Sequence, residues 1–198
     1  MRLLVLHHTP SPALQRLADA VVAGTHDPAI SGVEVIVRDP LEATADDLLT
    51  ADGYLLGTAA HFGYMSGALK ELFDRTFLAI GGSLESLPAD APSTAGRPFG
   101  LWVHGRYDVT GAVTSVLAIT GALEWRQSAG VLECLGDVDE AVCASAYDLG
   151  GTLAATLATQ TRDSTRSKTG FDPVKGGIRP RSRVCGAGGG RAASPWRP

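Results

Sequence analysis

Short apolar runs alternate with amphipathic stretches over the first 160 residues of the chain. The runs that are typical of buried strands are residues 3–6, 33–37, 53–56, 99–103 and 131–135. The stretches in which apolar positions recur at helical spacing are residues 14–22, 46–49, 65–77 and 111–123. A last helix is expected at Asp137, because Glu140 follows it three residues later in the pattern of a capping box. The order predicts a repeated strand–helix unit.

The strand-like runs are largely continuous in their apolar character, which indicates that both faces of the sheet are covered. Strands joined by helices pair in parallel, and right-handed crossovers leave few topologies. The pattern therefore predicts an α/β fold, a three-layer αβα sandwich around an open five-stranded parallel sheet, either Rossmann-like or flavodoxin-like. Because such sheets bind ligands beyond the carboxyl ends of their strands, the segments after residues 6, 56 and 103 are the candidate site.

Charge divides the chain into two parts. Residues 1–160 carry 8 Lys and Arg against 19 Asp and Glu, a net charge of −11, whereas residues 161–198 carry 9 against 2. The second part is rich in Gly, Arg, Ser and Pro and contains few large aliphatic residues, so it cannot offset its ordering entropy by burial. We expect a folded domain over 1–160 and a disordered basic tail over 161–198. We expect the tail to be solvated, without a nucleic-acid partner.

No apolar run approaches the roughly 20 residues that span a bilayer. The four apolar residues after Arg2 are too few for the central region of a signal peptide. We therefore expect a cytoplasmic protein without a membrane partner. The cysteines are scattered, odd in number and without the spacing of a metal site or a disulfide framework, at positions 134, 143 and 185.

The segment after the first strand begins a helix without a nucleotide motif. It contains neither GxGxxG nor GxxxxGK[ST]. Ser11 is a favourable N-cap and Pro12 suits the first helical position. The hydroxyl and N–H groups that could bind an anion there belong to Thr9, Ser11, Ala13, Leu14 and Gln15. Ordinary capping is the alternative interpretation.

The segment after the third strand has the composition of a site for a flat ligand. Gly63 permits a close backbone approach, and Phe62 and Tyr64 are placed to flank an aromatic ring. The alternative is that Phe62 belongs to the core and that Tyr64 is an ordinary surface residue. No GxSxG or HExxH motif is present, so a hydrolase lacks support.

This third-strand region resembles the flavodoxin-like flavoproteins. The resemblance rests on ADGYLLGT at 51–58, FGYMSGALK at 62–70 and FDR at 73–75. It extends over about residues 2–158 and is strongest to the branch of NADPH-dependent FMN reductases and WrbA-type NAD(P)H:quinone reductases. The resemblance implies a five-stranded parallel sheet in the order 2-1-3-4-5, with FMN at the ends of strands 1, 3 and 4.

The resemblance also implies three FMN-binding loops. The residues that would bind the phosphate are Thr9, Ser11, Ala13 and Leu14. The residues that would hold the isoalloxazine ring are Ala59, Ala60, His61, Phe62, Gly63 and Tyr64. The third loop, matched by its position after the strand alone, contributes His104, Gly105 and Tyr107. The chain departs from the family at Pro12, where a glycine is usual, and at Ala59, where a proline is usual. Pro10 and Pro12 also lack an N–H donor.

By this resemblance the chain is an enzyme that uses FMN and NAD(P)H and passes electrons to a quinone, a flavin or a similar small acceptor. The acceptor would stack between Phe62 and Tyr107. Two alternatives remain: a flavodoxin-type electron carrier, favoured by the acidic body, and a flavin-less scaffold, favoured by Pro10 and Pro12. The family often forms homodimers or homotetramers. No catalytic residue is assigned, and the candidate proton donors are His7, His8, His61 and His104.

Overall fold

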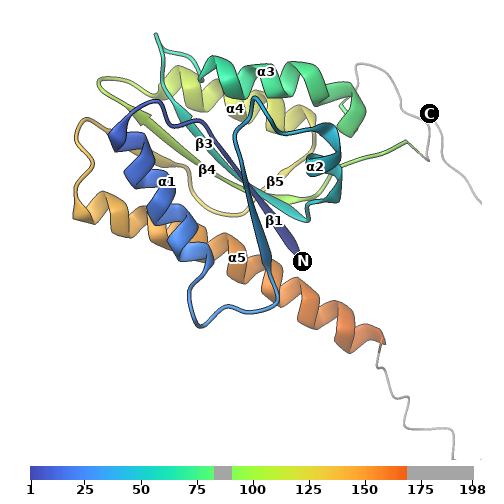
Figure 1. Cartoon of the computed structure of the whole chain (residues 1–198). Helices are drawn as coiled ribbons and strands as arrows, with labels where there is room; N and C mark the ends of the chain where they lie inside the picture. Colours follow the sequence, from blue (N-terminus) through green and yellow to red (C-terminus); the bar gives the residue numbers. More distant parts are fainter. Residues whose placement is uncertain (83–90, 169–198) are drawn as a thin grey trace, which may run out of the picture.

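The computed structural model describes residues 1–82 and 91–168. The strands are β1 (Arg2–His7), β2 (Glu34–Arg38), β3 (Gly53–Ala59), β4 (Pro98–Gly105), β5 (Arg126–Gln127) and β6 (Leu132–Leu135). The helices are α1 (Pro12–Thr25), α2 (Ala45–Thr50), α3 (Gly67–Thr76), the 3₁₀ turn η1 (Phe77–Ile80), α4 (Thr110–Ala122) and α5 (Glu140–Lys168). Strands and helices alternate as the apolar pattern predicts (Figure 1).

All strand pairs are parallel, in the order β2-β1-β3-β4-β5, and β6 also pairs with β4. The predicted fold and strand order are therefore confirmed, with one additional short strand. β5 pairs with the start of β4, at Pro98 and Phe99. β6 pairs with the end of β4, from Trp102 to Gly105. Two short segments thus share the edge position for which the sequence predicted one strand.

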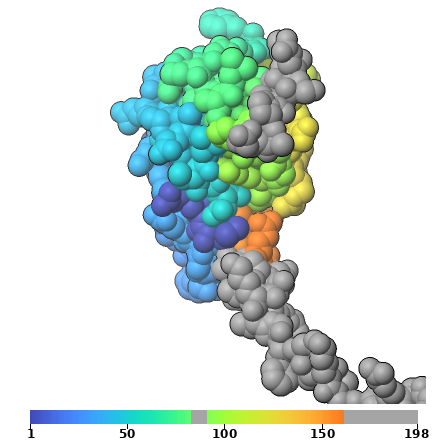
Figure 2. All heavy atoms as spheres, turned by 90° about the vertical axis from the view of Figure 1, so that its right-hand side faces the viewer, coloured from blue at the N-terminus to red at the C-terminus, as the bar shows by residue number. Residues whose placement is uncertain are grey.

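Alternate residues of β1 enter two separate cores. Leu4 and Leu6 belong to the core beneath α3 and α4, whereas Leu3 and Val5 belong to the core beneath α1 and α5. Figure 1 shows these helix pairs on opposite faces of the sheet. The helices cover both faces of the sheet, and the two ends of the strands stay accessible; in parallel sheets of this kind ligands bind beyond the carboxyl ends of the strands. Figure 2 views the edge where the strands begin, with the first residues of the chain in dark blue beside α5 in orange.

Helix α1 begins as predicted, but α5 does not. Ser11 caps α1 by accepting a hydrogen bond from the Leu14 N–H at 3.4 Å, and Pro12 is the first helical residue. The expected cap at Asp137 is wrong: α5 begins at Glu140, and Asp139 accepts from the Val142 N–H at 2.9 Å. The physical reason is Val138, which is buried against the core and whose carbonyl accepts from Arg16 at 2.7 Å, so the chain cannot turn into a helix before it.

Helix α5 continues past Gln160 to Lys168, and its end extends beyond the sheet in Figure 1. The domain boundary at 160 and the disorder of the tail stay predictions, since residues 169–198 lie outside the described residues. Within the described ranges, 1–82 and 91–168, no helix is both long enough and apolar enough to cross a membrane.

Candidate functional site

A tight turn follows β3 at the carboxyl edge of the sheet. The N–H of His61 donates to the Tyr64 carbonyl at 2.8 Å, and the N–H of Tyr64 donates to the His61 carbonyl at 3.0 Å. The two residues between them have positive φ, 51° at Phe62 and 77° at Gly63, as in a type I′ hairpin turn. For a bulky residue such as Phe62 this conformation is strained. Its side chain is nevertheless fully exposed, so packing among the described residues does not compensate the strain.

Contacts through the backbone hold this His61–Tyr64 turn in place. The Ala60 N–H donates to the His104 carbonyl of β4 at 2.8 Å. A Cβ atom at Gly111, in the first turn of α4, would lie 2.0 Å from the Gly63 carbonyl oxygen, so the glycine lets the helix touch the turn. Where the loop leads into α3, the buried Thr58 hydroxyl accepts a hydrogen bond from the Ser66 N–H at 2.9 Å. The turn is thus fixed between the ends of β3 and β4 and the start of α4.

Within the chain itself, glycine at position 63 serves the backbone conformation. A Cβ atom added there would meet no other protein atom within 4 Å, whereas the positive φ favours glycine. The expected close approach of a flat ligand to Gly63 stays a prediction. The crowded glycine of the motif is Gly57, where a Cβ atom would lie 2.0 Å from the Trp102 ring. Gly57 therefore serves the packing of the core, while Gly63 serves the shape of the turn.

A cavity of about 410 Å³ lies between the His61–Tyr64 turn and the loop after β4. We call it the carboxyl-edge cavity; its lining residues are Ala60, Phe62, Gly63, Arg106, Tyr107 and Asp108. Tyr107 is 85% exposed, so two unpacked aromatic rings border the same space. A flat aromatic ligand would cover both rings, and the ring system of FMN fits this arrangement. Arg106 was not among the predicted site residues, although its position after the strand pointed to it.

Asp108 lines the cavity, but its carboxylate is hydrogen-bonded to the first residue of α4. Its Oδ1 accepts from the N–H and the hydroxyl of Thr110, at 3.0 and 2.7 Å. These hydrogen bonds hold the pKa of the Asp108 carboxyl below its usual value. The charged carboxylate thereby stabilises the start of α4, where it complements the positive end of the helix.

The predicted phosphate loop leaves the same edge of the sheet, because β1 lies beside β3 with His7 opposite Gly57. Its predicted residues, Thr9, Ser11, Ala13 and Leu14, do not line the carboxyl-edge cavity. Two N–H groups expected to be free are bonded: Leu14 donates to the Ser11 hydroxyl and Gln15 to the Ser11 carbonyl at 3.0 Å. The Thr9 hydroxyl donates to the Gln15 side chain at 2.7 Å. At this 14-residue helix start the Ser11 hydroxyl keeps its own hydrogen to donate, whereas that of Thr9 is engaged, and phosphate binding here stays a prediction.

Two adjacent histidines at the end of β1 have different surroundings. His7 packs with its ring centroid 6.3 Å from that of Trp102, and its buried Nδ1 has no hydrogen-bond partner among the described residues. Burial lowers the pKa of His7, although Asp39 and Asp19 act in the opposite direction. His8 turns the other way, and its Nδ1 lies 2.9 Å from Asp39 Oδ2. This hydrogen bond joins the predicted phosphate loop to the end of β2.

The other two histidines also differ from each other. His61 is exposed in the turn after β3. His104 Nε2 lies 2.8 Å from the Gly136 carbonyl oxygen, which ties the end of β4 to the turn after β6. Of these two, His61 is therefore the one whose side chain is free to meet a ligand.

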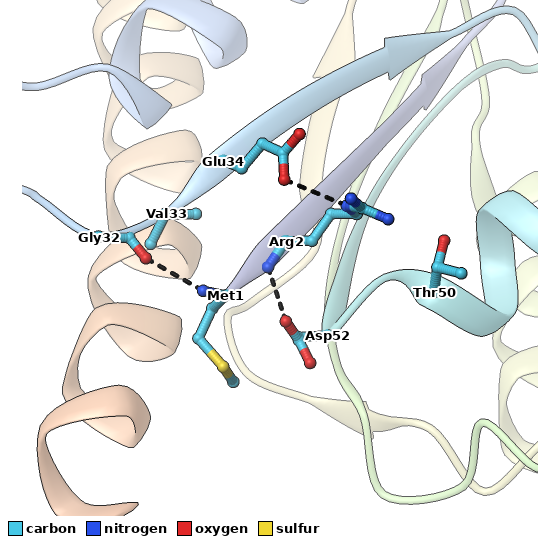
Figure 3. A pocket seen from close by; sticks show the side chains of 7 residues that line it. All are labelled: Met1, Arg2, Gly32, Val33, Glu34, Thr50 and Asp52. Carbon is cyan, nitrogen blue, oxygen red and sulfur yellow. Dashed lines mark hydrogen bonds and ion pairs between the residues drawn. The ribbon is translucent and has the colours of Figure 1, made fainter. Parts of the chain in front are cut away.

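A second hollow, of about 580 Å³, lies at the opposite edge of the sheet (Figure 3). We call it the amino-edge hollow; its lining residues are Met1, Arg2, Gly32, Val33, Glu34, Thr50 and Asp52. Its polar groups bind one another. Arg2 Nε pairs with Glu34 at 3.3 Å, the Arg2 N–H donates to Asp52 at 2.6 Å, and the terminal amine donates to the Gly32 carbonyl at 3.1 Å. These contacts fasten the first residues of the chain and leave little for a ligand.

An open parallel sheet in this order, with a ring-sized cavity between two loops at its carboxyl edge, defines a flavodoxin-like domain. The model of the family of NADPH-dependent FMN reductases matches residues 7–129. The chain belongs to this family. FMN is accordingly its flavin, and the nicotinamide nucleotide in the family's description is NADPH.

Among curated proteins, the chain is similar to a flavodoxin of Aquifex aeolicus, 30% identical over 95 residues, 48% of this chain and 50% of that protein. It is also similar to an NAD(P)H dehydrogenase (quinone) of Acidithiobacillus ferrooxidans, 32% identical over 95 residues, 38% of this chain and 46% of that protein. The chain spans about half the length of the curated relatives it matches.

Among solved structures, a flavodoxin from the domain Archaea matches with a TM-score of 0.65 at 16% identity, over 79% of this chain and 99% of that chain. A WrbA-like protein from Agrobacterium tumefaciens matches with a TM-score of 0.58 at 14% identity, over 80% and 98%. At these identities the structures support the fold alone.

Proposed function

We propose that the protein is an FMN-dependent NAD(P)H oxidoreductase that passes electrons to a quinone, a flavin or a similar small acceptor. The observation that carries this proposal is the carboxyl-edge cavity, which is lined by the exposed rings of Phe62 and Tyr107. Family membership and the relative named NAD(P)H dehydrogenase (quinone) support the reaction class.

The chemistry that FMN supplies when bound is acceptance of a hydride from a nicotinamide and delivery of electrons to an acceptor. The chain's own residues bind and orient the reactants. Phe62 and Tyr107 contact the flat rings, and the start of α1, with Thr9 and Ser11, lies where the phosphate is expected. The backbone that shapes the edge of the ring site is contributed by Ala59, Ala60, His61, Gly63, Tyr64, His104 and Gly105.

A flavodoxin-type electron carrier is the second candidate. The net charge of −11 over residues 1–160 favours it, because an acidic surface docks to basic redox partners. The relative named flavodoxin agrees with this reading. The two candidates differ in one respect: an enzyme turns over NAD(P)H by itself, whereas a carrier needs a separate reductase.

The visible spectrum of the purified protein, reconstituted with FMN, tests flavin binding first. NADPH oxidation is then followed at 340 nm with menadione, with riboflavin and without an acceptor. We expect turnover that depends on the acceptor and saturates with it. A holoprotein that binds FMN and is reduced by a ferredoxin reductase, but not by NADPH, would identify the carrier. Light scattering of the same sample measures whether the protein is a homodimer or homotetramer.

A further inference from the structure

Arg106 is an exposed cation at the carboxyl-edge cavity. Its Nε donates to the Tyr107 hydroxyl at 3.3 Å, and the guanidinium carbon lies 5.7 Å from the centroid of the Tyr107 ring. This single hydrogen bond and the contact with the ring orient the side chain and leave most of its five donors unused. Asp108, the carboxylate in the same wall, is bonded to Thr110 instead.

The other basic side chains of the acidic body are mostly engaged. Among the described side chains, those that form ion pairs are Arg2, Arg16, Arg38, Lys70 and Arg75. Arg97 donates to the carbonyls of Leu48 and Ala51 at 2.7 and 2.6 Å. Arg106 has no carboxylate partner within the part of the chain that the structure describes. An unpaired guanidinium beside a cavity is a ready partner for an anionic ligand.

The position of Arg106 matters because residues 1–160 carry a negative net charge. NADPH and NADH carry several negative charges, and a surface with a net charge of −11 repels them at long range. A nicotinamide that reaches a flavin in the carboxyl-edge cavity must bring its phosphates close to the cavity wall. Arg106 is the one basic residue among the described residues that line this cavity.

We propose that Arg106 binds a phosphate group of the nicotinamide nucleotide and so determines which hydride donor the enzyme accepts. This inference rests on the proposed function, because it assigns the donor's position at the same site. Arginine matches a phosphate with two parallel hydrogen bonds, and Tyr107 holds the guanidinium in place for them. Either the 2′-phosphate of NADPH or the pyrophosphate common to NADPH and NADH presents this chemistry.

The test is steady-state kinetics of the holoprotein with Arg106→Gln. The donors are NADPH, NADH and a phosphate-free donor, N-benzyl-1,4-dihydronicotinamide. We expect the KM for NADPH to rise by roughly ten- to a hundredfold, while the kinetics with the phosphate-free donor stay unchanged. A rise for NADPH alone assigns the 2′-phosphate, and an equal rise for NADH assigns the pyrophosphate. Arg106→Lys should recover part of the loss, because it keeps the charge without the paired geometry.

Arg126→Gln is the matched control. Arg126 is also exposed and has no polar side-chain partner among the described residues, but it lies on β5 opposite the start of β4. Its removal should leave the KM for NADPH unchanged. An equal effect of the two variants would mean that general charge, and not Arg106, attracts the nucleotide, and would overturn the inference.

Two further outcomes are decisive. An active Arg106→Gln variant with an unchanged KM for NADPH overturns the inference and leaves the proposed function standing. A variant that loses FMN instead shows that Arg106 contributes to binding the flavin, which also overturns the inference. Calorimetry of NADP⁺ binding to the holoprotein separates the two proposals. Binding that requires Arg106 in a protein without turnover supports the inference and contradicts the oxidoreductase, whereas no binding overturns the inference.

Discussion

The two edges of the sheet each carry a hollow, and the larger one is the poorer candidate for a site. The amino-edge hollow measures about 580 Å³ and the carboxyl-edge cavity about 410 Å³. In the first, charged and polar groups bind one another, as Arg2 binds Glu34. In the second, Phe62 and Tyr107 lack packing and Arg106 lacks a carboxylate partner among the described residues. The proposed site therefore rests on groups left without partners and not on volume.

The largest effect should separate two glycines with the same conformation. Gly63 (φ 77°) lies at the carboxyl-edge cavity and Gly32 (φ 82°) at the amino-edge hollow, and an added Cβ atom meets nothing within 4 Å at either. Valine at each should cost about 1–2 kcal/mol of stability, because only the backbone is strained. Flavin fluorescence should show a loss of FMN affinity of tenfold or more, on the order of 1.4 kcal/mol, for Gly63→Val alone.

Equal FMN affinity in the Gly63→Val and Gly32→Val proteins would contradict the assignment of the turn. Circular dichroism and urea unfolding establish that both variants fold. If Gly63→Val fails to fold while Gly32→Val folds, Gly63→Ala repeats the comparison with a smaller side chain. The two glycine variants are expected to lose the same amount of stability. A difference in their FMN affinity therefore reports which of the two positions lies at the flavin site.

The next effect should move stability and binding in opposite directions. Phe62→Gly removes a strained residue from the turn, so the free energy of unfolding should rise by about 1 kcal/mol. The same change removes a ring that contacts the flavin, an interaction worth about 0.5–1.5 kcal/mol beyond buried area. Urea denaturation of the apoprotein and FMN titration measure the two quantities. A variant that is less stable than the parent would show that Phe62 is held by packing after all.

A smaller effect is a loss of stability on acidification, which should come from His7 at the carboxyl edge. The pKa of His7 in the folded chain lies below its ordinary value of 6.5. Below pH 6.5 the unfolded chain therefore binds a proton that folded His7 resists, so stability falls as the pH drops from 6.5 toward the folded pKa. Asp39 affects stability in a different pH range. Burial raises the pKa of its carboxyl, but hydrogen bonds from His8 and Leu41 outweigh burial and hold the pKa below its ordinary value of 3.8.

Urea unfolding at pH 7.5 and 5.5 measures this slope, which should be shallower in His7→Gln. Asp39 stays charged in both states at these pH values, and its contribution is lost only at more acidic pH. The amino-edge hollow is lined by no histidine, so changes there should leave the slope as it is. An identical slope in the parent and in His7→Gln would show that His7 is not the group that titrates.

The smallest effect should come from the amino edge. Arg2→Gln removes the ion pair with Glu34, whose side chains are both more than a third exposed. Exposed pairs contribute about 0–1 kcal/mol and are screened by salt. Thermal unfolding should therefore change little, and FMN affinity and turnover should not change. A strong loss of flavin in Arg2→Gln would break the distinction between the edges.

The sequence predicted the parts of this molecule that follow from local patterns. Apolar runs located the strands except for β5, whose two residues are polar, and Ser11 with Pro12 located the start of α1, because capping depends on neighbouring residues. The cap predicted at Asp137 was wrong because the helix start depends on the burial of Val138 and on Arg16, more than a hundred residues away. The same holds for Arg97, whose bonds to Leu48 and Ala51 no spacing rule indicates.

The sequence predicted which segments form the candidate site, but it did not predict how their residues are arranged. The motif after β3 directed attention to Phe62 and Gly63, but their paired positive φ values depend on a backbone pairing that a motif does not encode. The third loop was matched only by its position after a strand, and within it Tyr107 but not Arg106 was assigned to the site. The contact of Gly111 with the Gly63 carbonyl joins two segments that the sequence treats separately.

The backbone anchoring of the His61–Tyr64 turn has a consequence for protein engineering. Hydrogen bonds between main-chain groups and the contact with Gly111 set the shape of the site, and these do not depend on the side chains at positions 62, 106 and 107. A mutant library confined to those three positions should keep its scaffold while it varies acceptor and donor preference. Libraries that also vary Gly57, Gly63 or Gly111 should yield mostly misfolded or inactive clones.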